Sequence, residues 1–300
     1  MKKILYLGIS ILLLLCFCSC GSIKTIEPAY HTEFTCSNLA DEATKSSVAS
    51  AMLAAGISEA RQAVFFDHVS QINDVVGQEN LMADFSVVKL SDLPQYDPYE
   101  LQDMWAESYP DFFGYNCRIT AYGLFGDYLR INESAEKSDQ SDLFLAFDIS
   151  ALEADDSVLT AGGSTDAFSV LFSTVPASAD VDIYEHVKTM QKSWSTRGVQ
   201  FLPSEKISLI TVIFHDHIGE NDYELFVGHT GVLIDAENDQ LWFVEKIAFQ
   251  EPYQVIRVNS RVELNDYLMG KYGFSNENTA APFIMENDHL MEGYRAIPPA

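Results

Sequence analysis

The spacing of apolar residues divides the chain into a helical first part and a strand-rich second part. Helices are expected where apolar side chains recur every three to four residues or where helix-forming residues gather. These segments are 39–55, 59–72, 98–107, 117–129, 182–197 and a helix that begins at Ser260. Strands are expected at 207–214, 223–234, 241–248 and 253–258. Helices followed by consecutive strands predict an α+β fold in which N-terminal helices pack on an antiparallel sheet.

Local signals mark where several of these helices begin. Asp97-Pro98-Tyr99-Glu100 offers a capping carboxylate, a proline at the first helical position and an acid in the first turn. Ser37-Asn38 is expected to cap the first helix, and Asn116 is expected to cap a helix that starts at the next residue.

The middle of the chain is less distinct. The apolar runs 144–149 and 168–172 fit a strand or a short helix equally well, because neither is long enough to show its period. The polar stretch 132–142 predicts an exposed loop, and the residues 237–239 predict a turn between two strands.

The first residues have the pattern of a secretory signal. A basic start, Met1-Lys2-Lys3, precedes the apolar run 4–17 and the small residues around Ser19 and Cys20. The end of this segment resembles a bacterial lipobox, which implies that Cys20 becomes the diacylated first residue of a palmitate-bearing lipoprotein. The resemblance implies a lipid anchor at the extracellular face of the bacterial membrane. The alternative is a cleaved, unlipidated secreted protein.

These features predict three parts of the chain. Residues 1–19 form the signal peptide, residues 20–36 form a tether, and residues 37–300 form a single α+β domain with an N-terminal helical part.

Composition limits the function. Of the 300 residues, 47% are hydrophobic and 12% aromatic, which favours a folded domain with a sizeable core. The chain has 18 basic and 44 acidic residues, a formal net charge of −26. Nucleic-acid binding depends on neutralising phosphates with Lys and Arg, so this charge argues against a nucleic-acid partner. The acids are dispersed, which is typical of a soluble surface.

The five cysteines reduce to two of interest. Cys16 and Cys18 leave with the signal peptide, and Cys20 is assigned to lipid. Cys36 and Cys117 remain. In an oxidising exterior these two could form a disulfide, which would exclude a catalytic role for either thiol.

Cys117 is the candidate nucleophile. It follows Gly114-Tyr115-Asn116 at the expected start of a helix, where the helix dipole and unpaired N–H groups favour a thiolate. The alternatives are a buried core thiol and the disulfide with Cys36. About a hundred residues later, His229 lies early in a strand between glycines, in Gly228-His229-Thr230-Gly231. An imidazole there could activate the thiol.

Hairpin geometry suggests a third member. If Asp235 opposes Asp239, Glu245 faces His229 on the next strand. A carboxylate orients an imidazole and stabilises its charged form, whereas Lys246, which a one-residue shift would place there, cannot. Glu245 is therefore the candidate orienting residue, an ordinary surface carboxylate is the alternative, and Asp235 is the fallback.

Other residues near these three have weaker signals. The backbone N–H of Cys117 is the default oxyanion donor, to which Tyr115 or Asn116 could add a side-chain donor. Arg118 could hold a substrate carboxylate or form an internal ion pair. His215-Asp216-His217 has no further ligand at a recognisable spacing, so neither a metal nor another cofactor is predicted.

The ordered trio of Cys117, His229 and Glu245 resembles the papain-like superfamily, in particular the NlpC-type cell-wall peptidases and amidases. The resemblance covers about residues 115–250 and implies a papain-like core. It places Cys117 as nucleophile and His229 as base. Glu245 takes a position where those families more often have His, Asn or Gln.

The whole chain also resembles a family of bacterial lipoproteins, the domain of unknown function numbered 4300. The residues that carry this resemblance are Tyr115-Asn116-Cys117-Arg118, Gly228-His229-Thr230-Gly231 and Phe243-Val244-Glu245-Lys246. That family name implies no activity.

Together these observations favour a membrane-anchored extracellular cysteine hydrolase, a peptidase or amidase. It would cleave an envelope peptide or amide, such as a cell-wall peptide, through an acyl-enzyme. The first alternative is a non-catalytic surface lipoprotein that binds a solute or a partner on a hydrolase-like scaffold. The second is transglutaminase-like acyl transfer to an amine.

Overall fold

The computed structural model describes residues 29–93, 96–132, 143–236, 240–274 and 278–297. It has helices together with an antiparallel sheet, so the predicted α+β class is confirmed. The predicted signal peptide, Cys20, nearly all of the polar loop 132–142 and the turn 237–239 lie outside the described residues. Among the described helices, none has both the length and the apolar character needed to cross a membrane.

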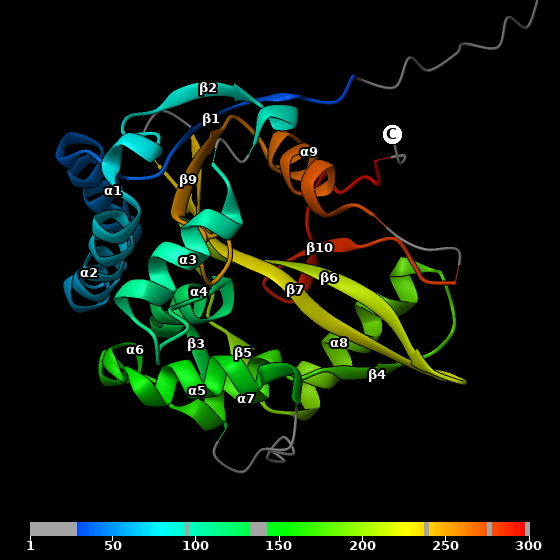
Figure 1. Ribbon diagram of the computed structural model, residues 1–300. Helices are drawn as coiled ribbons and strands as arrows, with labels where there is room; N and C mark the ends of the chain where they lie inside the picture. Colours follow the sequence, from blue (N-terminus) through cyan, green and yellow to red (C-terminus); the bar gives the residue numbers. More distant parts are fainter. Residues whose placement is uncertain (1–28, 94–95, 133–142, 237–239, 275–277, 298–300) are drawn as a thin grey trace, which may run out of the picture.

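One large sheet forms the centre of the molecule (Figure 1). Its strands follow the order β11-β10-β6-β7-β8-β9-β1-β2, and β4 pairs with β7 beside this path. The strands are β1 (Glu33–Ser37), β2 (Ser86–Lys89), β4 (Val175–Ala177), β6 (Ile207–Gly219), β7 (Asp222–Asp235), β8 (Leu241–Lys246), β9 (Tyr253–Val258), β10 (Phe283–Glu286) and β11 (His289–Leu290). A separate pair joins β3 (Leu129–Ile131) to β5 (Val199–Phe201). The four consecutive strands β6 to β9 form the predicted antiparallel meander.

Part of the predicted tether is a strand of this sheet. Residues 33–36 belong to β1, which pairs with β9 on one side and β2 on the other. Phe34 and Cys36 alternate with polar residues and are fully buried, which is the pattern of a strand with a covered face. The tether prediction was wrong here because so short an alternation lacks the length of a clear strand signal.

The helices surround the sheet and mostly match the predicted segments. They are α1 (Glu42–Ala55), α2 (Glu59–Val76), α3 (Pro98–Ser108), α4 (Cys117–Phe125), α5 (Ala146–Ala154), α6 (Ser157–Thr160), α7 (Thr165–Phe172), α8 (Ile183–Thr196) and α9 (Arg261–Tyr272). Short 3-10 turns occupy Gln78–Asn80, Leu90–Asp92, Gly126–Tyr128 and Leu143–Leu145. The last of these turns and α5 contain the ambiguous run 144–149, and α7 contains 168–172.

Three helix boundaries differ from expectation, and one of them is the end of α2, which runs to Val76 rather than to residue 72. The cap of α1 is Asp41, whose Oδ1 accepts from the Thr44 N–H at 2.9 Å, whereas Ser37-Asn38 lies at the end of β1. The helix that begins at Cys117 ends at Phe125, because a 3-10 turn at Gly126–Tyr128 leads directly into β3.

Both faces of the sheet are covered, which explains the nearly continuous apolar sequence of β6 and β7. On one face, side chains such as Leu209, Val227 and Val244 pack in the core that includes α2 and α4. On the other face, side chains such as Val212 and Phe243 pack against α9. Figure 1 shows α1 and α2 at one end of the molecule and the long β6–β7 hairpin extending toward the other.

Candidate active site

Cys117 is the first residue of α4, and the preceding residues fix its position. Asn116 caps the helix, since its Oδ1 accepts from the Ile119 N–H at 3.0 Å. Gly114 has φ of +87°, and a Cβ there would lie 3.1 Å from the Trp105 ring and 3.3 Å from the Phe249 carbonyl oxygen. Only glycine fits this turn without strain, so the chain is brought to the helix start along a defined path.

The N-terminus of α4 docks against a gap along one edge of β7. On that edge, β4 pairs with Tyr223–Leu225 and β8 pairs with Gly231–Asp235. Among the described strands, none pairs with residues 226–230 on this side. Arg118 Nη1 donates to the Val227 carbonyl across the gap at 3.1 Å. This contact places the residue after Cys117 directly beside the strand that carries His229.

A β-bulge at Gly228 sets the direction of the His229 side chain. Val212 pairs with His229 and Ile213 pairs with Val227, so Gly228 is an extra residue on β7. A bulge reverses the alternation of side chains, and bulges are frequent beside active sites. As a result, His229 shares a face of the sheet with Phe226, although the two are three positions apart. Gly228 must lack a side chain, because a Cβ would lie 2.3 Å from the Phe214 ring.

The three predicted residues meet at this point. His229 Nε2 lies 2.5 Å from Glu245 Oε2, and His229 also forms a side-chain hydrogen bond with Cys117. Because Nε2 faces the carboxylate, Nδ1 is the ring nitrogen left for the sulfur. Cys117 is 6% exposed, His229 1% and Glu245 0%. The three groups therefore interact with almost no water between them.

The Glu245 carboxylate is held by residues that the sequence analysis did not identify. Its Oε1 accepts from Gln254 Nε2 at 3.0 Å and from the Tyr267 hydroxyl. Gln254 is opposite Glu245 on β9, and Tyr267 lies on α9. These donors occupy the second carboxylate oxygen, so Glu245 is fixed in position to orient His229.

The predicted pairing of Glu245 was wrong by two residues. Glu245 lies opposite Gly231 rather than opposite His229, and Asp235 pairs with Leu241 rather than with Asp239. A shift of two residues preserves the face of the sheet, so Glu245 still reaches His229 diagonally. The fallback residue Asp235 is exposed at the far end of β7 and does not join the site.

The pKa values follow from this arrangement. Burial raises the pKa of Cys117, but the hydrogen bond and charge of His229, together with the charge of Arg118, outweigh burial and bring it below the usual thiol value. Burial lowers the pKa of His229, yet its hydrogen bonds with Cys117 and Glu245 raise it to about 9. Despite burial, the Lys271 charge and His229 lower the pKa of Glu245 to about 2. The favoured state is thiolate, imidazolium and carboxylate, the charge state that an activated cysteine nucleophile needs.

The side chains of Tyr115 and Asn116, predicted as additional oxyanion donors, both form internal hydrogen bonds. The Tyr115 hydroxyl donates to Asp155, and its ring stacks on His68 with centroids 3.6 Å apart. Asn116 Nδ2 donates to Asp148 Oδ1 at 2.7 Å, while its oxygen caps the helix. Both side chains are occupied by internal bonds. The backbone N–H of Cys117 remains the oxyanion donor that the geometry offers.

Arg118 forms the internal ion pair that was one of its two predicted roles. Its Nε and Nη2 each donate to one oxygen of Asp148 at 2.8 Å. The Asp148 side chain is 1% exposed, so the pair is buried at the base of α4. A bidentate pair of this kind fixes orientation as well as charge. Arg118 therefore links α4 to α5, which carries Asp148, as well as to β7.

Lys246 holds the loop that follows β8, in a role that sequence reasoning missed. Its ammonium donates to the carbonyls of Ala248 at 2.6 Å, Phe249 at 3.1 Å and Glu251. The side chain is 1% exposed, and burial lowers its pKa to about 7. The anchored loop brings the Phe249 carbonyl against Gly114, three residues before Cys117.

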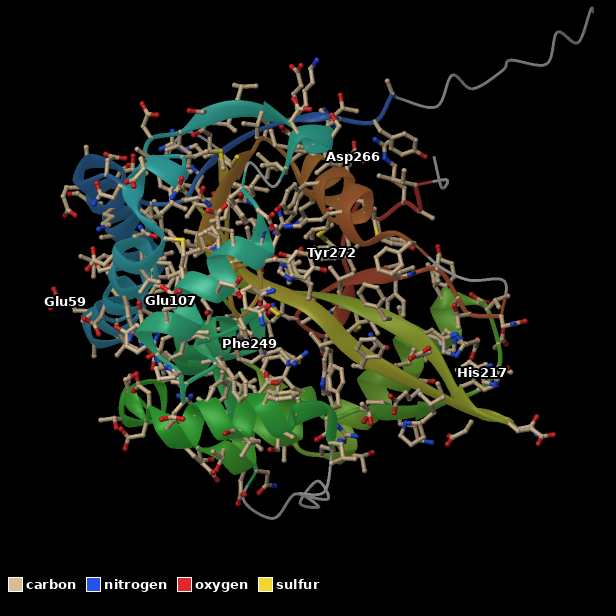
Figure 2. The ribbon with its side chains drawn as sticks, in the orientation of Figure 1. Glu59, Glu107, His217, Phe249, Asp266 and Tyr272 are labelled. Carbon is tan, nitrogen blue, oxygen red and sulfur yellow. The ribbon has the colours of Figure 1, made fainter. Side chains whose placement is uncertain are left out.

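Tyr272 covers the other side of the histidine. Its ring stacks on the His229 ring with centroids 4.5 Å apart. Figure 2 shows Tyr272 and Phe249 in the central part of the molecule, near β7. The candidate site therefore lies among aromatic and backbone groups contributed by α9 and by the loop after β8. The position of Tyr272 at the end of a predicted helix gave no signal of this contact.

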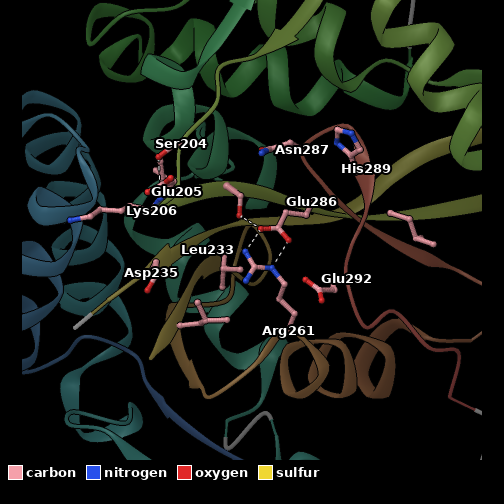
Figure 3. A pocket seen from close by; sticks show the side chains of 14 residues that line it. Ser204, Glu205, Lys206, Leu233, Asp235, Arg261, Glu286, Asn287, His289 and Glu292 are labelled. Atoms are coloured by element: carbon pink, nitrogen blue, oxygen red, sulfur yellow. Dashed lines mark hydrogen bonds and ion pairs between the residues drawn. The ribbon is translucent and has the colours of Figure 1, made fainter. Parts of the chain in front are cut away.

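A polar pocket elsewhere does not include the candidate nucleophile Cys117. It has a volume of about 300 Å³ and lies where β6 and α9 begin and β7 and β10 end (Figure 3). Arg261 donates to both oxygens of Glu286 at 2.6 Å, and Ser208 donates to the same carboxylate at 2.7 Å. Its central charges therefore neutralise each other, and none of the three candidate residues lines it.

The His215-Asp216-His217 segment makes its described contacts with residues outside the candidate site. His215 Nδ1 accepts from the Ala280 N–H at 2.9 Å, and His217 stacks on Tyr223 with ring centroids 4.5 Å apart. Within the described ranges, no group of three or more His, Cys, Asp or Glu residues is arranged to hold a metal ion.

Most of the chain matches a known protein family. The family model described as "Domain of unknown function (DUF4300)" matches residues 35–291. No curated protein and no solved structure matches the chain. The family description names no activity, so the functional argument depends on the geometry of the site.

Proposed function

We propose that this chain, which belongs to the DUF4300 family, is a cysteine hydrolase that cleaves an amide or peptide bond through an acyl-enzyme. The observation that carries the proposal is the hydrogen-bonded series Cys117–His229–Glu245. Such a series is the arrangement by which a nucleophile, a base and an orienting group act together. Burial of the series strengthens its electrostatic interactions relative to those in water.

The residues suggest a definite order of steps. The Cys117 thiolate attacks the substrate carbonyl, and the backbone N–H of Cys117 donates to the resulting oxyanion. The tetrahedral intermediate collapses as the C–N bond breaks, and the His229 imidazolium gives its proton to the leaving amine. The acyl group remains on sulfur as a thioester. Water, deprotonated by His229, then attacks the thioester and releases a carboxylic acid and the thiolate.

A papain-like core is part of this proposal. It is supported by a helix that begins at the candidate nucleophile and packs on an antiparallel sheet carrying the histidine. The order Cys117, His229 and Glu245 along the chain also fits. The carboxylate remains a departure from the His, Asn or Gln that those families more often have at this position.

We also propose that the enzyme is anchored by lipid at Cys20 and acts at the extracellular face of the membrane. The support is the basic, apolar and small-residue pattern of residues 1–20. The substrate class that fits this location is an envelope peptide or amide, such as a cell-wall peptide. This substrate class follows from the location and from the fold analogy.

Acylation by an activated ester tests the hydrolase proposal. The full chain is mixed with p-nitrophenyl acetate, and the protein is analysed by intact mass and peptide mapping. We expect one acetyl group on Cys117, faster acetylation than of glutathione, and turnover as the thioester hydrolyses. Cys117→Ala should remove both the adduct and the turnover. A folded wild-type protein that forms no Cys117 adduct would contradict the proposal.

The same experiment separates the alternatives. Cys117 is only 6% exposed. If no reagent acylates this thiol in the folded protein, the result favours the non-catalytic binding scaffold. Addition of a primary amine distinguishes water from an amine as the acyl acceptor. If the acetyl group is transferred mainly to the amine at a low amine concentration, the activity is acyl transfer of the transglutaminase type.

A further inference from the structure

A strip of aromatic rings extends from the candidate site along the face of the sheet that carries His229. It consists of Phe144, Phe226, Phe214 and Phe274. The Phe144 and Phe226 rings have centroids 5.0 Å apart, Phe226 and Phe214 are stacked at 5.5 Å, and Phe214 and Phe274 lie at 5.7 Å. We call these four residues the aromatic strip.

The aromatic strip begins next to the reacting groups. At one end, the guanidinium of Arg118, the residue after Cys117, lies 4.6 Å from the centre of the Phe144 ring. In the middle, the Phe214 ring packs directly on Gly228, the residue before His229. Phe226 faces the same side as His229 because of the bulge at Gly228. A group attached to a substrate carbonyl at Cys117 would therefore lie within reach of these rings.

The rings are only partly covered. Phe144, Phe226 and Phe214 are half-buried, and Phe274 is 68% exposed. Arg118, the charge that contacts the Phe144 end of the strip, is neutralised by Asp148. At this end of the strip, a charged or strongly polar substrate group would lose water without gaining an unneutralised charge as partner. An apolar ring would gain contact area and favourable ring geometry.

We infer that the aromatic strip is a substrate subsite that selects a large apolar group, preferably aromatic, beside the bond that is cleaved. The substrate class is a peptide or amide with such a side chain. This inference rests on the proposed function, since it assigns the specificity of the same site. The bulge at Gly228 is the structural feature that unites the base and the subsite on one face.

A pair of covalent probes tests the inference without knowledge of the natural substrate. N-(2-phenylethyl)-2-chloroacetamide and N-(2-hydroxyethyl)-2-chloroacetamide carry the same electrophile but differ in the attached group. In both probes, the Cys117 thiolate forms a bond to the carbon that bears chlorine as the C–Cl bond breaks and chloride leaves. Second-order rates of Cys117 labelling in the full chain are divided by the rates with glutathione, which removes differences in intrinsic reactivity.

We expect the phenylethyl probe to label Cys117 about tenfold faster than the hydroxyethyl probe, as one favourable ring contact predicts. Phe226→Ala should reduce this preference to about twofold or less, and Phe214→Leu should weaken it. Tyr184→Ala is the matched control, since Tyr184 is an aromatic residue on α8 with 61% exposure and is not part of the strip. That variant should keep the full preference.

Two outcomes would overturn the inference. One is equal normalised rates of Cys117 labelling by the two probes. A second protein copy that covered the strip would also give equal rates, and the strip would then not be a substrate subsite. The other is an unchanged preference in folded Phe226→Ala and Phe214→Leu. In both cases, rapid labelling of Cys117 by iodoacetamide would still support the proposed nucleophile. Failure of iodoacetamide to label Cys117 would instead contradict the proposed function itself.

Discussion

Replacing Glu245 with glutamine removes one charge from the buried series while nearly preserving its shape. Glu245 accepts from His229, Gln254 and Tyr267 and is fully buried. A hydrogen bond to a charged group contributes about 1.5–3 kcal/mol. If the imidazolium loses that stabilisation, the thiolate–imidazolium state becomes less favourable by the same amount. At about 1.4 kcal/mol for each factor of ten, the equilibrium constant between the thiolate–imidazolium state and the neutral thiol–imidazole state falls roughly 10- to 100-fold.

Alkylation kinetics measure the thiolate fraction of Cys117. The second-order rate of Cys117 labelling by iodoacetamide is determined from about pH 5 to about pH 9, where thiolate fractions control thiol reactivity. E245Q should be labelled more slowly than wild type near pH 6, by up to roughly 100-fold. E286Q is the matched control, because Glu286 also pairs with a cation but lies in the separate polar pocket. Its rate should equal that of wild type.

Stability should depend on pH in a corresponding way. The pKa of His229 is raised to about 9. Its contribution to the free energy of unfolding is therefore complete below its ordinary pKa of 6.5 and is lost as pH rises through about 9. The pKa of Glu245 is lowered to about 2, so its contribution is complete above 4.5 and is lost as pH falls through about 2. In E245Q, the alkaline loss should begin at lower pH. A folded E245Q protein with wild-type alkylation and a wild-type alkaline transition would refute the assigned role of Glu245.

Three other predictions concern the surroundings of the site. Asp148→Asn leaves the Arg118 guanidinium without its buried counter-charge, so the free energy of unfolding in urea should fall by roughly 3 kcal/mol. Glu185→Gln, which breaks the exposed Glu185–Lys188 pair, should leave the urea midpoint unchanged, and an equal effect of the two variants would be inconsistent with the burial argument. Cys36→Ala should not alter the labelling of Cys117, because burial raises the pKa of Cys36 to about 12 and both thiols are free; a Cys36–Cys117 disulfide in peptide mapping would contradict this. Lys246→Met leaves three loop carbonyls without their shared donor, so the free energy of unfolding should fall by on the order of 2 kcal/mol. Hydrogen exchange should increase in residues 247–252, and unchanged exchange would count against this anchoring role.

The start of α4 could be predicted from the sequence because its signals are local. Asn116 is a capping residue followed directly by Cys117, and both lie where the sequence places them, at the start of a helix. His229 was singled out by its glycine neighbours, and one of these, Gly228, is the bulge residue. Short-range backbone chemistry was therefore sufficient to find the thiol and the imidazole.

The parts that sequence reasoning missed depend on distant segments. The contact of Glu245 with His229 was predicted through an incorrect register, since the loop before β8 is longer than assumed. The prediction still placed Glu245 on the same face of the sheet as His229, because the register error was an even number of residues. Tyr267, Tyr272 and Gln254 come from α9 and β9, and no pattern within those segments reveals which side chains meet Glu245 or His229.

Sheet membership was also hard to predict at the two ends of the described chain. β1 joins the sheet between β9 and β2, and β10 joins it beside β6. Each is short, and its partners are far away in sequence. The alternation in Phe34 and Cys36 is a weak signal by itself, because five residues are compatible with several structures.

The most direct test of the central claim is the rate at which iodoacetamide labels Cys117 in the folded full chain near pH 6, with and without the His229→Ala substitution. The arrangement of thiol, imidazole and carboxylate predicts that Cys117 in wild type reacts at least tenfold faster than an ordinary thiol at this pH, and that His229→Ala loses this advantage. Labelling of Cys117 at the rate of an ordinary thiol, or a rate that His229→Ala leaves unchanged, would contradict the account.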